Sequence, residues 1–345
     1  MNDSYRFQCG GLPATVAVGP AALDVDGRSL PYIEMDTVTA AGHRIELGMH
    51  GADSVTLSAL GPSYDAFLAD LDTARAADRR AALLQWTGTP ELDSYRQAPG
   101  GESDVPTTVH LFADGLTVEP RCGVPEMVPF GLLDRVERDG YTITLHRRGL
   151  TPVAIRRLGP RTDEFIADLE RARVAARRQV GDAFAALDDR LTGFQAPNGW
   201  AVRADEAGVF GGALAEVFAA GDRADEVAVL LGLARQPARY GIALQPDGPM
   251  PFVLVAGASK AAVEAVGEGE ARATYVFATT DLDRLNTALL LTGFRREALY
   301  LPEASLGRWS LAARALPVVQ WARSAYSARV VHDDAWPAAV AAALH

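Results

Sequence analysis

The chain contains the same domain twice. Residues 13–80 and 106–178 are two copies, and from Met35 to Arg80 they align without a gap at a shift of 98 positions. Identical pairs at this shift include Asp36 and Asp134, Ile45 and Ile143, Leu60 and Leu158, Phe67 and Phe165, and Arg75 and Arg173. A register kept over 46 positions indicates duplication, so both copies are expected to share one fold.

The first part of each copy predicts short antiparallel strands. Apolar and polar residues alternate at 15–18 and 108–111, which is the period of a half-buried strand. The same alternation returns around Ile45 and Ile143. Turn dipeptides such as Asp26-Gly27 and Asp139-Gly140 separate these runs, as expected for hairpins.

Each copy ends in a predicted helix. Pro62 and Pro160 stand near the first turns of these two helices. A proline lacks the backbone N–H, but an N–H in the first turn would have no acceptor within the helix, so no hydrogen bond is lost. Apolar residues then recur at helical spacing, at Phe67, Leu68, Leu71 and Ala74 in the first copy and at Phe165, Ile166, Leu169 and Ala172 in the second. The predicted unit is therefore five to seven antiparallel strands followed by one capping helix.

This order resembles the bacterial PH-like domains and the related GRAM domains. Both copies also contain a proline, an aromatic residue and a later Asp-x-Val before the middle hairpin, beginning at Pro31 and Pro129. The resemblance covers both copies, about half of the chain. It implies a small, partly open β-barrel plugged at one end by the C-terminal helix.

The expected fold class is α+β, with four segments. They are a first PH-like domain at 1–87, a flexible linker at 88–105, a second PH-like domain at 106–194, and a C-terminal mixed α/β domain with terminal helices at 195–345. The linker is predicted from its Gly, Pro, Ser and acidic residues. The C-terminal segment is either a third, diverged PH-like copy or a different fold.

Within that last segment, some elements can be predicted individually. Strands are expected at 227–233, 240–244, 252–256 and 273–279, and helices at 281–292, 312–331 and 335–344. Helix 281–292 has Leu282, Leu285 and Leu289 on one face.

Charge and composition exclude some classes of function. The net charge is −11, and residues 1–100 contain 7 basic and 13 acidic groups, which argues against nucleic acid or an anionic membrane surface as a partner. No apolar run reaches 18 residues, so no integral membrane association is expected. The start has no secretory pattern, and two cysteines are too few for a disulfide framework. A cytoplasmic location is predicted.

No catalytic or metal-binding motif is visible. The six histidines are scattered and form no H-x-x-x-H pattern, and no G-x-S-x-G elbow occurs. We therefore expect no catalytic residue, no metal and no cofactor. An enzyme with an unrecognised site in 195–345 stays open as an alternative.

Five arginines of the second copy form the best candidate site, on or beside one hairpin. They are Arg147, Arg148, Arg156, Arg157 and Arg161, and their counterparts in the first copy are Met49, His50, Ser58, Ala59 and Ser63. Guanidinium groups bind phosphate and carboxylate well, so an anion or an acidic partner could bind here. Alternatively, the arginines pair with acids of the same chain. Adjacent residues of a strand face opposite sides of the sheet, so we do not expect all five arginine side chains to converge on one site.

The leading hypothesis is a non-enzymatic protein-interaction or scaffold protein with an unknown protein partner. Exposed strand edges and the face beside the capping helix would be its binding surfaces. The alternative is binding of an anionic small ligand or lipid headgroup by the arginine hairpin. The sequence pattern does not determine the oligomeric state.

Overall fold

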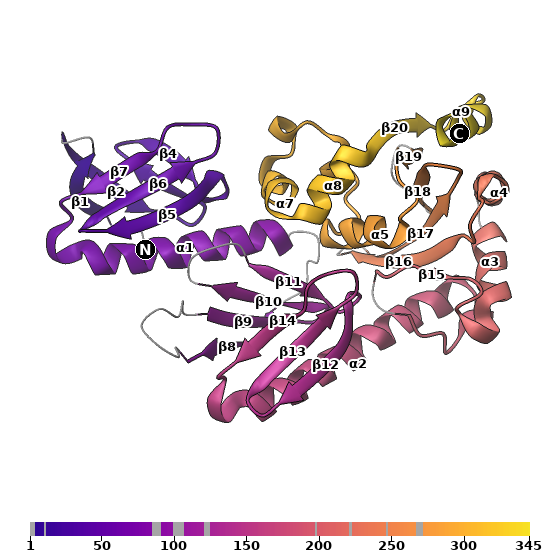
Figure 1. Cartoon of the computed structure of the whole chain (residues 1–345), viewed down its shortest axis with the longest axis horizontal. Helices are drawn as coiled ribbons and strands as arrows, with labels where there is room; N and C mark the ends of the chain where they lie inside the picture. Colours follow the sequence, from indigo (N-terminus) through magenta and orange to yellow (C-terminus); the bar gives the residue numbers. More distant parts are fainter. Residues whose placement is uncertain are drawn as a thin grey trace.

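The computed structural model describes residues 4–9, 12–84, 91–98, 107–120, 125–196, 199–220, 223–245, 248–266 and 272–345. These residues form an α+β protein with four antiparallel sheets. Figure 1 shows two small strand-rich units with one long helix each, α1 and α2, beside a larger C-terminal unit. The α+β class was therefore predicted correctly.

The first repeat has one seven-stranded sheet and one capping helix. Its strands, β1 to β7, are Ser4–Cys9, Leu12–Val18, Ala22–Val25, Arg28–Pro31, Met35–Ala41, Arg44–Met49 and Val55–Ser58. They lie in the order β4-β3-β2-β1-β7-β6-β5. Helix α1, Tyr64–Leu84, buries Phe67 and Leu71 against Ile45 and Leu57 of the sheet. The apolar spacing seen in the sequence thus forms the core.

The second repeat has the same strand order in two sheets. Its strands, β8 to β14, are Glu91–Gln97, Thr107–Phe112, Gly115–Pro120, Glu126–Pro129, Leu133–Asp139, Thr142–Arg147 and Val153–Arg156. The sheets run β11-β10-β9-β8 and β12-β13-β14. The Ala98 amide donates to the Arg157 carbonyl oxygen at 3.0 Å, so β8 meets β14 as β1 meets β7. Helix α2, Thr162–Leu187, caps this repeat.

The expected linker at 88–105 contains strand β8, which corrects that prediction for residues 91–97. The Tyr95 side chain is 1 % exposed and lies edge to face on Phe165 of α2, with 5.0 Å between the ring centroids. Tyr5 contacts Phe67 in the same way at 5.2 Å. This strand was not predicted because six of its seven residues are not buried, so the sequence has no alternation of apolar and polar residues there. Residues 88–90 and 99–105 of that region lie outside the described part.

Neither repeat is closed into a barrel over the residues that the structure describes. In the first repeat β4 and β5 lie at opposite edges of the sheet, and β11 and β12 are edges in the second. The small barrels implied by the family resemblance are therefore open sheets folded around a capping helix.

The C-terminal unit is a six-stranded sheet in sequential order, from β15 to β20. Its strands are Val202–Arg203, Arg239–Gln245, Gly248–Ala256, Ala261–Ala265, Ala273–Phe277 and Tyr326–Val331. Its helices, α3 to α9, are Gly211–Ala220, Ala224–Leu233, Leu282–Leu291, Glu297–Tyr300, Ser310–Ala315, Pro317–Ala325 and Trp336–Leu344. Short 3-10 turns occur in all three units. These turns, η1 to η7, lie at Tyr32–Glu34, Gly61–Ser63, Gly159–Arg161, Asp189–Leu191, Gly208–Phe210, Glu303–Ser305 and Gly307–Trp309.

Helices cover both faces of this sheet. The end of α2 and helices α3, α4 and α9 bury Phe184, Phe218, Leu230 and Val340 on one face. Helices α5, α7 and α8 bury Leu285, Leu289, Leu311 and Val319 on the other face. This strand order and two-sided cover differ from both repeats, so the unit does not reproduce their architecture as a third copy would.

Several predicted elements of this unit are confirmed and two are wrong. Strand β19 and helices α5 and α9 lie where the sequence predicted them. The predicted strand 227–233 is part of helix α4, because a short apolar run does not distinguish a buried strand from a buried helix. The predicted helix 312–331 is instead α7, α8 and β20, with a break before Pro317, which begins α8.

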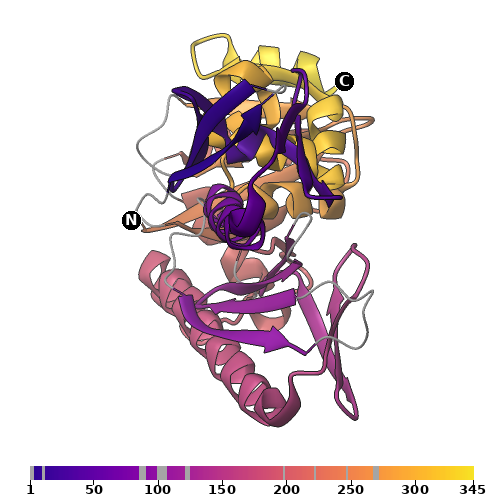
Figure 2. The same cartoon turned by 90° about the vertical axis from the view of Figure 1, so that its left-hand side faces the viewer.

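The repeats pack on the C-terminal unit. Leu83 of α1 and Met127 of β11 belong to the same buried cluster as Phe252 and Leu289. Arg308 donates to the Asp78 carboxylate at 2.6 Å, which joins the C-terminal unit to α1. Figure 1 shows the end of α1 beside the C-terminal unit, and Figure 2 shows this helix above the second repeat.

Candidate functional site

The five arginines predicted as a site lie at two separate places of the second repeat. Arg147 and Arg148 are at the end of β13, whereas Arg156 pairs with Thr142 at its start. Five residues of strand separate these positions, about 17 Å at 3.3 Å per residue. Arg161 lies in η3, directly before α2. The arginines therefore do not form one patch.

Arg147 and Arg161 bond to groups of the same chain. Arg147 donates to Glu126 at 2.9 Å and to the Thr151 carbonyl oxygen at 2.8 Å. Arg161 donates to Asp93 at 2.7 Å and to Glu164 at 2.9 Å. This pairing matches the alternative that the arginines neutralise acids within the chain.

The other three arginines have different surroundings. The Arg148 guanidinium lies 3.8 Å from the Asp134 carboxylate and 4.4 Å from the centroid of the Trp200 ring, a cation–π contact with the C-terminal unit. Arg156 is exposed. Arg157 has a φ of 58°, and its counterpart Ala59 has a φ of 59°, so this left-handed position belongs to the shared backbone.

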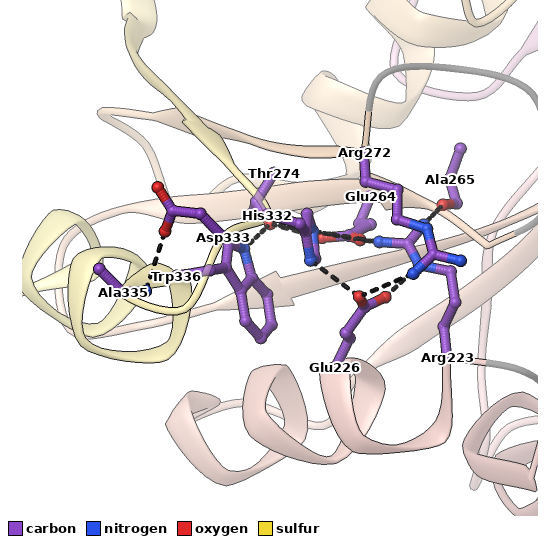
Figure 3. Close-up of polar contacts among 10 residues, drawn as sticks. All are labelled: Arg223, Glu226, Glu264, Ala265, Arg272, Thr274, His332, Asp333, Ala335 and Trp336. Atoms are coloured by element: carbon purple, nitrogen blue, oxygen red, sulfur yellow. Dashed lines mark hydrogen bonds and ion pairs between the residues drawn. The ribbon is translucent and has the colours of Figure 1, made fainter.

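A buried cluster of charged and polar groups lies in the C-terminal unit. We call it the His332 cluster, and its members are Arg223, Glu226, Glu264, Thr274 and His332. Arg223 and Glu226 come from the start of α4, Glu264 from β18, Thr274 from β19, and His332 directly follows β20. Figure 3 shows their side chains converging beside Trp336 of α9.

His332 lies between the two carboxylates of this cluster. Its Nδ1 is 3.0 Å from Glu226 and its Nε2 is 2.8 Å from Glu264. The imidazole stacks on the Trp336 ring, with 4.2 Å between centroids. Burial lowers the pKa of His332; the Glu226 carboxylate opposes this effect and Arg223 adds to it. The neutral ring is therefore favoured, and it can donate to only one of the two acids.

Arg223 determines whether the His332 cluster can bind a metal ion. Glu226, Glu264 and His332 together resemble a set of metal ligands, because their ligand atoms lie within 4.8 Å of one another. However, the guanidinium of Arg223 contacts both Glu226 and Glu264. A divalent cation would have to displace a positive group that already neutralises these acids. The geometry fits an ion-pair network that joins α4, the sheet and α9 better than a metal centre.

The His332 cluster was not predicted from the sequence. Its members come from positions 223 to 332 and have no common spacing. One local signal was present: Glu264, 2 % exposed, is the only charged residue of the otherwise apolar strand β18. A single charge in a buried strand requires partners, although it does not identify them.

A third candidate is the free edge of β5 in the first repeat. Strands β5 and β12 are equivalent, each lies at the edge of its sheet, and each has the same pattern of one buried residue followed by mostly exposed ones. After the shared aspartate, β5 reads Thr-Val-Thr-Ala-Ala and β12 reads Arg-Val-Glu-Arg-Asp. Charged residues on edge strands discourage pairing with another chain. The edge of β5 lacks this protection.

The geometry of the hairpin shows which backbone groups face outward. Gly42 and His43 form a two-residue turn with φ of 57° and 59°, so Ala41 and Arg44 are a hydrogen-bonded pair. Because pairing alternates along an antiparallel ladder, the N–H and C=O groups of Val38 and Ala40 point toward the free edge. In the described chain no strand pairs with that edge.

No family model matches the chain, and a comparison with curated proteins finds no match. The PH-like resemblance therefore rests on the residue pattern and element order of the two repeats. Among the helices of the described residues, none combines the length and apolarity needed to cross a bilayer.

Proposed function

We propose that this chain is a non-enzymatic, cytoplasmic interaction protein built from repeated PH-like domains. Its partner would be a protein that adds an extended segment to the edge of β5. Such strand addition gains affinity from main-chain hydrogen bonds and specificity from alternate side chains. The observation that carries the proposal is the contrast between two equivalent edges: after the shared aspartate, β12 has charged residues and β5 has none.

The size and composition of the β5 edge support this proposal. Thr37, Thr39, Ala40 and Ala41 are exposed, and Val38 is half-buried. This stretch is uncharged, whereas residues 1–100 contain 7 basic and 13 acidic groups. A partner strand could therefore form main-chain hydrogen bonds with β5, and no charged side chain of residues 37–41 would repel a like charge on that strand.

The alternatives have weaker support. An anion or lipid headgroup at the arginine hairpin would have to compete with Glu126 for Arg147 and with Asp93 for Arg161. An active site in the C-terminal unit would have to use the His332 cluster, whose polar groups bond to one another. We therefore favour interaction over catalysis or anion binding.

The internal repeat supplies the variant that tests the proposal. Replacing Thr37→Arg, Thr39→Glu, Ala40→Arg and Ala41→Asp gives β5 the charges of β12, which the shared fold already tolerates at these positions. Affinity capture from the source lysate should retain a protein with the wild type and lose it with this variant. The matched control is the reverse exchange in β12, Arg135→Thr, Glu137→Thr, Arg138→Ala and Asp139→Ala, which should keep that protein.

Equal retention by the wild type and the β5 variant would overturn the assignment of this edge. Thermal unfolding of both variants checks that each chain is folded. The charge change itself should alter stability little, since surface substitutions are usually within about 0.5 kcal/mol.

A further inference from the structure

The two capping helices are equivalent, but their second halves have different surroundings. In the first repeat, other parts of the molecule cover the second half of α1. Arg80 contacts the Glu119 carboxylate of the second repeat at 2.5 Å, and Arg79 donates to the Met35 carbonyl oxygen at 2.7 Å. Leu83 is fully buried in the core shared with the C-terminal unit. Arg80 and Leu83 thus dock α1 on other parts of the molecule, whereas Arg79 bonds to β5 of its own repeat.

The same three positions of α2 open into a groove. They are Arg177, Arg178 and Gly181, at the shift of 98 that relates the repeats. With residues 192–195 they line a groove of about 420 Å³. Gly181 stands where the first repeat has Leu83, and its lack of a side chain leaves the groove open. It also lets residues 192–195 approach the helix closely, because a Cβ at 181 would lie 3.1 Å from the Phe194 carbonyl oxygen.

The groove combines apolar surface with positive charge. Val174 is 63 % exposed, where the first repeat has Ala76, and lies one turn before Arg178. Arg177 and Arg178 are exposed, and the one acid lining the groove, Asp182, is 4.0 Å from Arg178. The lining therefore has a net positive charge in a chain of net charge −11. An exposed apolar side chain beside two guanidinium groups suits an acidic segment that also contains apolar residues.

We propose that this groove on α2 binds an acidic segment of a partner protein. The segment would present a carboxylate to Arg178 as Glu119 presents one to Arg80, and an apolar side chain to Val174. The molecule thus contains its own example of the contact, at the equivalent position of the duplicated helix. This site is separate from the edge of β5, so either can fail without the other.

The test uses a fluorescein-labelled peptide of glutamate and leucine residues, with a glutamine and leucine peptide as its neutral match. Anisotropy is measured with the full chain at low ionic strength. The overall negative charge of the protein repels an acidic peptide, so binding reports a local positive site. Two variants are compared with the wild type: Arg177→Glu with Arg178→Glu, and the control Arg171→Glu. Arg171 is exposed on the same helix but does not line the groove.

We expect the wild type and the Arg171→Glu control to bind the glutamate peptide with similar affinity. The double variant should bind it at least about ten-fold more weakly, which corresponds to 1.4 kcal/mol. The neutral peptide should bind the wild type as weakly as the double variant binds the acidic one. Equal binding by the wild type and the double variant would overturn the proposal, and so would no binding by the wild type. Thermal unfolding confirms that the variants are folded.

Discussion

Tyr5 and Tyr95 occupy the same position in the two repeats. Each donates its hydroxyl hydrogen bond to an aspartate of the capping helix that follows, Asp70 or Asp168. The two aspartates are related by the shift of 98, but the tyrosines are 90 positions apart. The duplication therefore includes the first strand of each repeat, beyond the region that aligns without a gap.

Tyr95 is predicted to hold β8 in the second repeat. Removing its hydroxyl with Tyr95→Phe should cost about 1 kcal/mol of unfolding free energy, the usual worth of one hydrogen bond. Removing the ring with Tyr95→Ala should cost about 4 kcal/mol, because it leaves a cavity beside Phe165. Urea unfolding measures both. A flexible linker at this position would instead give two variants as stable as the wild type.

The contact between Arg80 and Glu119 is predicted to stabilise the docking of the repeats. Glu119 is 6 % exposed, so Glu119→Ala leaves the Arg80 guanidinium without its carboxylate in a mostly buried place. We expect a loss of about 3 kcal/mol. Replacing both residues with apolar ones, Arg80→Met with Glu119→Leu, should recover part of that loss. Arg80→Met and Glu119→Leu are also made singly, and losses that add up in this double-mutant cycle would mean that the two side chains do not interact.

His332 is predicted to make stability depend on pH. Its pKa is lowered in the folded protein by burial, so the unfolded chain, with a pKa of about 6.5, binds the proton more readily. The contribution of the neutral ring is complete above about pH 6.5 and is lost as the pH falls from there toward the lower, folded-state pKa. Urea unfolding between neutral and mildly acidic pH should show this loss.

The control for that prediction is His332→Gln, which cannot titrate in this range. Its stability should be lower at neutral pH and should change less with pH than that of the wild type. If the wild type instead becomes more stable on acidification, the protonated ring is the favoured form, and the two carboxylates outweigh burial.

Local pattern predicted most elements of the two repeats. The alternation around Ile45 and Ile143 and the helical spacing after Pro62 and Pro160 report directly which side chains are buried. Strand β8 escaped because only Tyr95 is buried in it, so its pattern is that of a polar loop. The apolar run 227–233 was assigned to a strand because helices and strands that are largely buried share that composition.

The candidate sites were less predictable than the fold. The arginine hairpin was visible as a set of residues, but register separated Arg147 from Arg156, and intrachain acids paired Arg147 and Arg161. The His332 cluster depends on sheet order, which places β18, β19 and β20 side by side. The edge of β5 could be seen only once the sheet order showed that β5 and β12 are both terminal strands.

The most direct test of the proposed function is amide hydrogen exchange along β5, with and without the protein retained by affinity capture. Strand addition predicts that the amides of Val38 and Ala40 exchange quickly in the free chain and become protected in the complex. The amides of Thr39 and Ala41, already bonded to β6, should change little. A complex that forms while Val38 and Ala40 still exchange quickly would contradict strand addition at this edge.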